Sequence, residues 1–208
     1  MDIEVDYNNL FSILKINGGL INDWGNVYKH CLTEGRIANI VSEIFNLSKE
    51  EKDILISAAI LHDWYKKHEI HKLKKNGIEG IISSSEESYK GLLELGINKR
   101  VVDIAHSVGS FVLNDVDSYD LSRKLMHYID DICDGDKIVK IQDRIIKLKS
   151  LDKYKEINQY GYTLYGKSLF DKQLEVGLQI ENELSYLLGG VNIFDKIKDK
   201  YESIYYRN

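Results

Sequence analysis

Apolar residues recur at helical spacing along almost the whole chain of 208 residues, and no proline interrupts the pattern. Proline would break a helix because it lacks a backbone N–H and its ring collides with the preceding turn. In the stretch 26–45, one helical face carries four apolar residues and a histidine: Val27, His30, Ala38, Val41 and Ile44. Clean alternation of apolar and polar residues, the mark of a half-buried strand, persists nowhere for a strand's length. The sequence therefore predicts an all-α fold.

Capping residues mark several helix ends. Ser48 and Glu51 have the spacing of a capping box at a helix start. Gly96 suits the C-terminal end of one helix, and Asn98 suits the start of the next. The irregular, basic stretch 67–83 is predicted to be a loop. Further amphipathic helices are expected in the segments 120–135, 137–150, 168–188 and 191–206.

Length and composition favour one cytoplasmic domain, residues 1–208, with a single sizeable core. The formal net charge of −5 argues against general binding to nucleic acid or to anionic membranes. No apolar run reaches the length of about eighteen residues that a membrane span needs. The polar start MDIEVDYNN does not resemble a signal peptide. Cys31 and Cys133 are too few for a disulfide framework, which favours a reducing compartment.

The stretch GYTLYGKS, residues 161–168, matches the phosphate-binding pattern G-x-x-x-x-G-K-[ST]. A P-loop needs a hydrophobic strand before it, and the preceding DKYKEINQY is polar and charged. We therefore predict a turn that leads into a helix capped by Ser168. A P-loop triphosphatase is left as a third alternative.

The stretch LHDWYKK, residues 61–67, places His62 and Asp63 at the end of an apolar helix. His30 lies near the apolar face of the preceding helix, and Asp130 lies in the apolar segment MHYIDDICDG. A buried aspartate is rare unless it is paired or binds a metal, although each residue alone also fits a satisfied core polar group. Together, two imidazoles and two carboxylates from three helices suit one divalent ion: Mn, Co, Ni, Fe, Zn or Mg.

This set resembles the HD superfamily of metal-dependent phosphohydrolases. The resemblance runs from YKHCLTEGRIANIVSEIF through AAILHDWYKK to VVDIAHSV and LMHYIDDICDG. It implies a helical bundle of the HD-domain type, with a metal-binding core in residues 20–150. The C-terminal helices, residues 151–208, would pack on that core.

The resemblance also implies residue roles. His30 would be the first ligand, His62 and Asp63 the central doublet, and Asp130 the last ligand. Asp131 would be either the alternative last ligand or a hydrogen-bond or proton acceptor beside the ion, and Asp63 would also be catalytic. The HD-x-x-K pattern of the family makes Lys66 a candidate phosphate contact, with Lys67 as the alternative.

His106 fits one of two further histidines that two-metal members of this family carry. Serines at 83–85 stand where the other would be, so we expect a single ion. His106 would bind phosphate or protonate the leaving oxygen. The alternative is a helix-end histidine that is hydrogen-bonded to Asp103, one turn earlier.

We therefore expect a hydrolase that uses metal-activated water to cleave a phosphate ester of a nucleotide or a related small molecule. The alternative is a non-catalytic helical module that binds a nucleotide or another protein in the same pocket. The tyrosine-rich stretch 154–165 leaves a homodimer open beside simple core packing.

Overall fold

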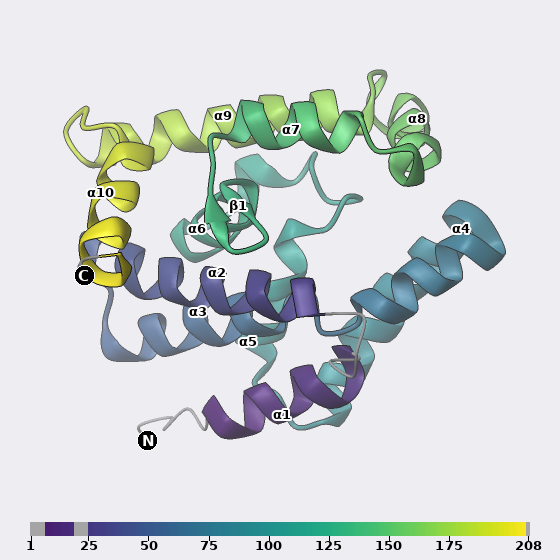
Figure 1. The fold of residues 1–208 in the computed structure, drawn as a ribbon, viewed down its shortest axis with the longest axis horizontal. Coiled ribbons are helices and arrows are strands. Elements are labelled where there is room, and N and C mark those ends of the chain that lie inside the picture. Colours follow the sequence, from purple (N-terminus) through teal and green to yellow (C-terminus); the bar gives the residue numbers. More distant parts are fainter. Residues whose placement is uncertain (1–6, 19–24, 207–208) are drawn as a thin grey trace.

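The computed structural model describes residues 7–18 and 25–206, and almost all of the secondary structure in these residues is helical (Figure 1). The elements are α1 (Tyr7–Gly18), α2 (Gly25–Ile44), α3 (Lys49–Leu61), α4 (Lys66–Glu94), α5 (Lys99–Ala105), α6 (Leu121–Asp131), β1 (Cys133–Asp134), β2 (Lys137–Ile138), α7 (Ile141–Lys149), α8 (Lys155–Tyr165), α9 (Leu169–Leu187) and α10 (Ile193–Tyr205). The prediction of an all-α fold is confirmed. The HD type and the division at residue 150 stay predictions.

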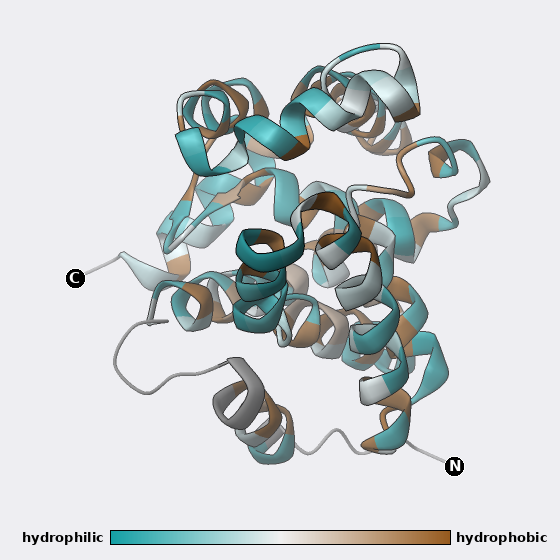
Figure 2. Cartoon of the chain, turned by 90° about the vertical axis from the view of Figure 1, so that its right-hand side faces the viewer, coloured by the Kyte–Doolittle hydropathy of each residue, from teal (hydrophilic) through white to brown (hydrophobic). Residues whose placement is uncertain are grey.

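Helix α6 occupies the centre of the molecule. It packs against α2 and α3 on one side and against α9 on the other. Its side chains Leu125, Met126, Tyr128 and Ile129 are completely buried. Apolar and polar stretches alternate along the helices, as they do in amphipathic helices that share one core (Figure 2). No helix in residues 7–18 and 25–206 is long and apolar enough to cross a membrane.

The predicted caps are present. Ser48 and Glu51 form a complete capping box at the start of α3. The Asn98 side chain accepts a hydrogen bond from the Arg100 amide at the start of α5, over 2.8 Å. Gly96 adopts a left-handed backbone (φ +79°) after α4, which glycine tolerates without strain. Ser168 accepts a hydrogen bond from the Asp171 amide and so caps α9.

The prediction of a loop at residues 67–83 is wrong, because this stretch belongs to the helical hairpin α4. The backbone breaks at Gly77 (φ 58°, ψ −143°), and the second half folds back along the first. The Tyr65 hydroxyl donates to Glu87 over 2.8 Å. A straight helix would separate two residues at that spacing by about 33 Å. Gly80 allows the close approach of the two arms, since a Cβ there would lie 2.4 Å from the Lys72 carbonyl oxygen.

A short β-hairpin replaces the helical ends that were predicted around residue 135. Helix α6 ends at Asp131, and α7 begins only at Ile141. Between them Cys133 pairs with Ile138, and Gly135 takes a left-handed conformation (φ +64°) in the turn. The hairpin reverses the chain and brings α7 back over the end of α6 (Figure 1).

The stretch GYTLYGKS does not form a phosphate-binding loop. Residues 161–165 are the last turn of α8, Gly166 ends that helix in a left-handed conformation, and Ser168 begins α9. At Gly161 the two helices touch, because a Cβ there would lie 2.0 Å from the Leu169 backbone nitrogen. The two glycines therefore serve helix packing and a turn.

Gly161→Ala is expected to lower the free energy of unfolding by about 1–3 kcal/mol, because a backbone atom cannot move aside as a flexible side chain can. Urea denaturation measures the change. Gly25→Ala is the matched control, since an added Cβ there meets no atom of the described residues within 4 Å. Equal stability of the two variants would contradict the close contact of α8 and α9.

Candidate metal centre

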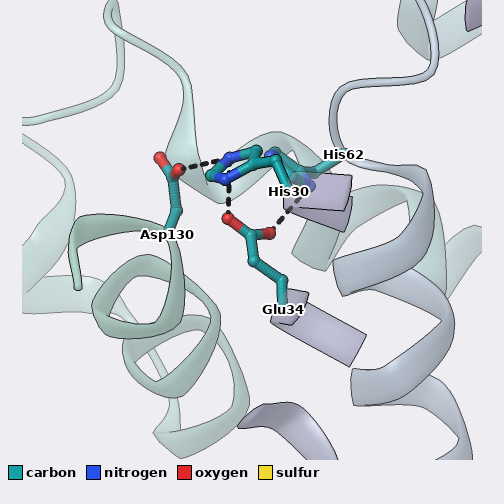
Figure 3. Close-up of side chains that lie close together, drawn as sticks. All are labelled: His30, Glu34, His62 and Asp130. Atoms are coloured by element: carbon teal, nitrogen blue, oxygen red, sulfur yellow. Dashed lines mark ion pairs between the residues drawn. The ribbon is translucent and has the colours of Figure 1, made fainter. Parts of the chain in front are cut away.

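Four side chains from three segments meet at the junction of α2, α3 and α6 (Figure 3). His30 and Glu34 come from α2, where a spacing of four residues puts them on one face. His62 follows α3 directly, and Asp130 lies near the end of α6. One donor atom from each residue lies within 4.8 Å of those of the other three, so the group could hold a metal ion.

Glu34 lies between the two imidazoles (Figure 3). Its Oε1 is 2.9 Å from His30 Nε2, and its Oε2 is 3.0 Å from His62 Nδ1. Asp130 Oδ1 approaches His30 Nε2 to 3.3 Å. Glu34 is fully buried, so its carboxylate has no access to bulk water. A buried carboxylate of this kind needs a cation beside it.

Several buried atoms of this group lack a hydrogen bond among the described residues. They are both carboxylate oxygens of Glu34, His62 Nε2 and His30 Nδ1. The contacts of Glu34 with the imidazoles are short, but they do not have the alignment of hydrogen bonds. Such unsatisfied atoms cost free energy. A divalent ion with nitrogen and oxygen ligands would satisfy the Glu34 oxygens and one nitrogen of each imidazole, and the donor set therefore fits such an ion.

Asp63 lies beside this group. Its Oδ2 is 3.7 Å from His62 Nε2, while His62 Nδ1 lies 2.9 Å from the Ala59 carbonyl oxygen. A hydrogen bond from Nδ1 to that carbonyl would leave the lone pair of Nε2 on the side of Asp63. Two ligands of one ion, each about 2.1 Å from it, lie roughly 3–4 Å apart. Asp63 is thus within reach of an ion bound at His62 Nε2.

The structure brings together three of the four predicted ligands, His30, His62 and Asp130, and it adds Glu34. Sequence reasoning missed Glu34. The available signal was a charged residue inside the apolar stripe of α2, between His30 and Ala38, where an acid is rare unless it is paired.

Asp131 is directed elsewhere. It is buried against α9, where it accepts a hydrogen bond from Gln173 over 2.8 Å and lies 3.1 Å from His127 Nδ1. A Cβ at Gly177 of α9 would lie 2.5 Å from its Oδ2. These contacts join α6 to α9, and Asp131 is not one of the four grouped side chains.

His106 begins the short 3₁₀ turn that follows α5, and its ring packs edge-on against Tyr89 with centroids 5.0 Å apart. The Asp103 carboxylate accepts hydrogen bonds from the Tyr89 hydroxyl and from Lys99. Burial lowers the pKa of His106 to about 4. The imidazole is therefore neutral at neutral pH, which disfavours proton donation to a leaving oxygen. His106 is not part of the grouped side chains, and its predicted roles stay predictions.

The two predicted phosphate contacts differ in their surroundings. The Lys66 ammonium lies 3.4 Å from Asp63 Oδ1 and 3.3 Å from Glu69 Oε1. Burial lowers the pKa of Lys66, but the Asp63 and Glu69 carboxylates outweigh it and hold the pKa well above its usual range. Lys67, by contrast, is exposed. Lys66 is therefore a fixed positive charge next to the central doublet.

The acids control the protonation of the imidazoles. Burial lowers the pKa of His62, but Glu34 and Asp63 outweigh it and raise the pKa to about 9. For His30, burial is likewise outweighed by Glu34 and Asp130, and its pKa is raised well above the usual value. Without a metal, both imidazoles are therefore protonated on both nitrogens and positively charged at neutral pH.

Comparisons of the chain with family models, with curated proteins and with solved structures gave no match. The resemblance to the HD superfamily accordingly rests on the quoted residues alone and stays a prediction.

Binding of a divalent ion at pH 7 is expected to release about two protons, because an imidazole must be deprotonated to coordinate a metal. The number of protons released should fall as the pH rises through about 9, because His62 loses its proton over this range in the metal-free protein. Titration calorimetry in two buffers with different ionisation heats measures the number. Identical heats in both buffers would contradict the protonated imidazoles.

Proposed function

We propose that this protein is a metal-dependent phosphohydrolase that cleaves a phosphate ester of a nucleotide or of a related small molecule. The observation that supports the proposal most strongly is the buried group of two imidazoles and two carboxylates with unsatisfied atoms. A purely structural core has no need for such a group. The adjacent, partly exposed ammonium of Lys66 supplies the positive charge that a phosphate would require.

His30, Glu34, His62 and Asp130 would hold the ion, and Asp63 lies within reach of it. Their nitrogen and oxygen donors suit Mn, Co, Ni, Fe, Zn or Mg. When bound, a divalent ion supplies Lewis acidity, which lowers the pKa of water and polarises a phosphoryl group.

Two side chains at the edge of this group would act on the substrate. Lys66 is 28% exposed, so its ammonium can contact a phosphate oxygen and balance the charge that develops in the transition state. Burial raises the pKa of Asp63, but Lys66 and the two imidazoles outweigh it and lower the pKa below its usual value. The Asp63 carboxylate is therefore ionised at neutral pH, as an acceptor for a proton of an attacking water must be.

Phosphate release from a panel of nucleotides and phosphate esters, with Mn, Co, Ni and Mg added separately, tests the proposal. We expect at least one ester to be hydrolysed in the presence of one of these ions. His62→Gln should lose both ion binding and hydrolysis, whereas Lys167→Ala should keep both, because that lysine is exposed and pairs with Glu175. Ion and nucleotide binding without any phosphate release would instead support the non-catalytic binding module.

Lys66→Met is expected to lower kcat/KM by about a hundredfold, because a positive charge beside the phosphate is lost. Steady-state kinetics on the ester identified above measures the change. Lys67→Met is the matched comparison, since the neighbouring lysine is exposed and should change kcat/KM little. A loss confined to Lys67→Met would transfer the phosphate contact to Lys67.

A further inference from the structure

Arg144, a residue of α7, reaches across to the last turn of α6. Its Nη2 donates to Asp130 Oδ1 over 2.8 Å, and its Nη1 donates to the main-chain carbonyl of the same residue. The two side chains are only 13% and 14% exposed, so this is a largely buried ion pair. Nothing in the local sequence around Arg144 pointed to a role at the metal centre.

The two contacts hold different parts of one residue. The bond to the carbonyl fixes the backbone at the end of α6, where helix carbonyls lack partners within the helix. The bond to Oδ1 fixes the direction of the side chain. That same oxygen lies 3.3 Å from His30 Nε2, so the guanidinium holds Asp130 in the position that it takes within the metal centre.

Arg144 is itself held in place. The β-hairpin returns the chain after α6, with the Val139 amide donating to the Ile132 carbonyl over 2.8 Å. Arg144 Nη1 also lies 3.9 Å from Asp131 Oδ1, and Asp131 is bonded to Gln173 of α9. The guanidinium thus connects the metal centre to α7 and α9 through contacts with defined geometry.

Lys147 of the same helix makes an ion pair of a different kind. Its ammonium binds the Asp134 carboxylate over 2.5 Å, but its side chain is 56% exposed. Exposed pairs contribute little to stability. Lys147 lies one turn beyond Arg144 and has no contact with the metal centre among the described interactions, so it is a suitable control.

We propose that Arg144 is a positioning residue of the metal centre: its two-point contact with Asp130 sets the geometry, and hence the ion affinity, of a site that it does not itself enter. The proposal rests on the proposed metal site. A planar guanidinium can make two directed contacts at once, whereas the single ammonium of a lysine is a point charge on a flexible stem. The contact geometry, and not the positive charge alone, is therefore what Arg144 contributes.

The test is the dissociation constant of Co²⁺, measured by calorimetry on the full-length chain after metal removal. Arg144→Gln and Arg144→Lys should both bind Co²⁺ about 10–100-fold more weakly, as other changes of residues that orient metal ligands do. Lys147→Gln should bind with unchanged affinity. The visible absorption of bound Co²⁺ should change in Arg144→Lys, because this absorption depends on coordination geometry and not on overall stability.

Several outcomes would overturn the proposal. Wild-type affinity in folded Arg144→Gln would show that Asp130 needs no positioning. Wild-type affinity and absorption in Arg144→Lys would show that the positive charge alone suffices. If circular dichroism shows that Arg144→Gln is unfolded, the result for Arg144→Lys alone tests the proposal. Absence of binding of Mn²⁺, Co²⁺, Ni²⁺ and Mg²⁺ alike in the unaltered protein would remove the proposed function and this inference together. Weakened Co²⁺ binding by the Lys147 control alone would overturn only the inference.

Discussion

The structure depends on how a surplus of negative charge is accommodated where α2, α3 and α6 meet. The largely buried charged side chains near this junction are Glu34, Asp63, Asp130, Asp131, Lys66 and Arg144. Four acids against two bases leave a surplus of negative charge. The buried His127 offsets part of it, since Asp131 outweighs the effect of burial and raises the pKa of this imidazole. Buried charges are costly unless they are compensated. Two protonated imidazoles compensate them in the metal-free protein, and one divalent ion would do so with the imidazoles neutral. The same charge balance explains why Lys66 and Arg144 are positioned so closely against carboxylates.

Local signals in the sequence were enough to predict most helices but not the two chain reversals. Ser48, Asn98 and Ser168 act through amides two or three residues away, so their capping can be recognised from sequence alone. The hairpin in α4 depends on contacts such as that of Tyr65 with Glu87, which arise only after the chain has folded back. The β-hairpin after α6 has strands of two residues each, which is too short for any alternation to be visible.

The residues of the candidate metal centre also differ in how far the sequence predicts them. His30, His62 and Asp130 could be predicted because their residue types and order form a pattern, whereas Arg144 could not, because only the β-hairpin brings it to the site. Asp130 and Asp131 differ for a simple geometric reason. Consecutive residues of a helix point about 100° apart, so one faces α2 while the other faces α9. The sequence favoured Asp130 as the ligand and kept Asp131 as the alternative.

The hairpin in α4 also has a mechanical consequence for the residues before it. Trp64 directly follows the His62–Asp63 doublet, and its indole N–H donates to Ser88 in the second arm over 2.7 Å. The ring lies so close to Gly91 that a Cβ there would be 2.8 Å from it. The second arm therefore holds the segment that carries the doublet in place. Contacts made by residues more than twenty positions away in the chain therefore help to fix the alignment of the doublet.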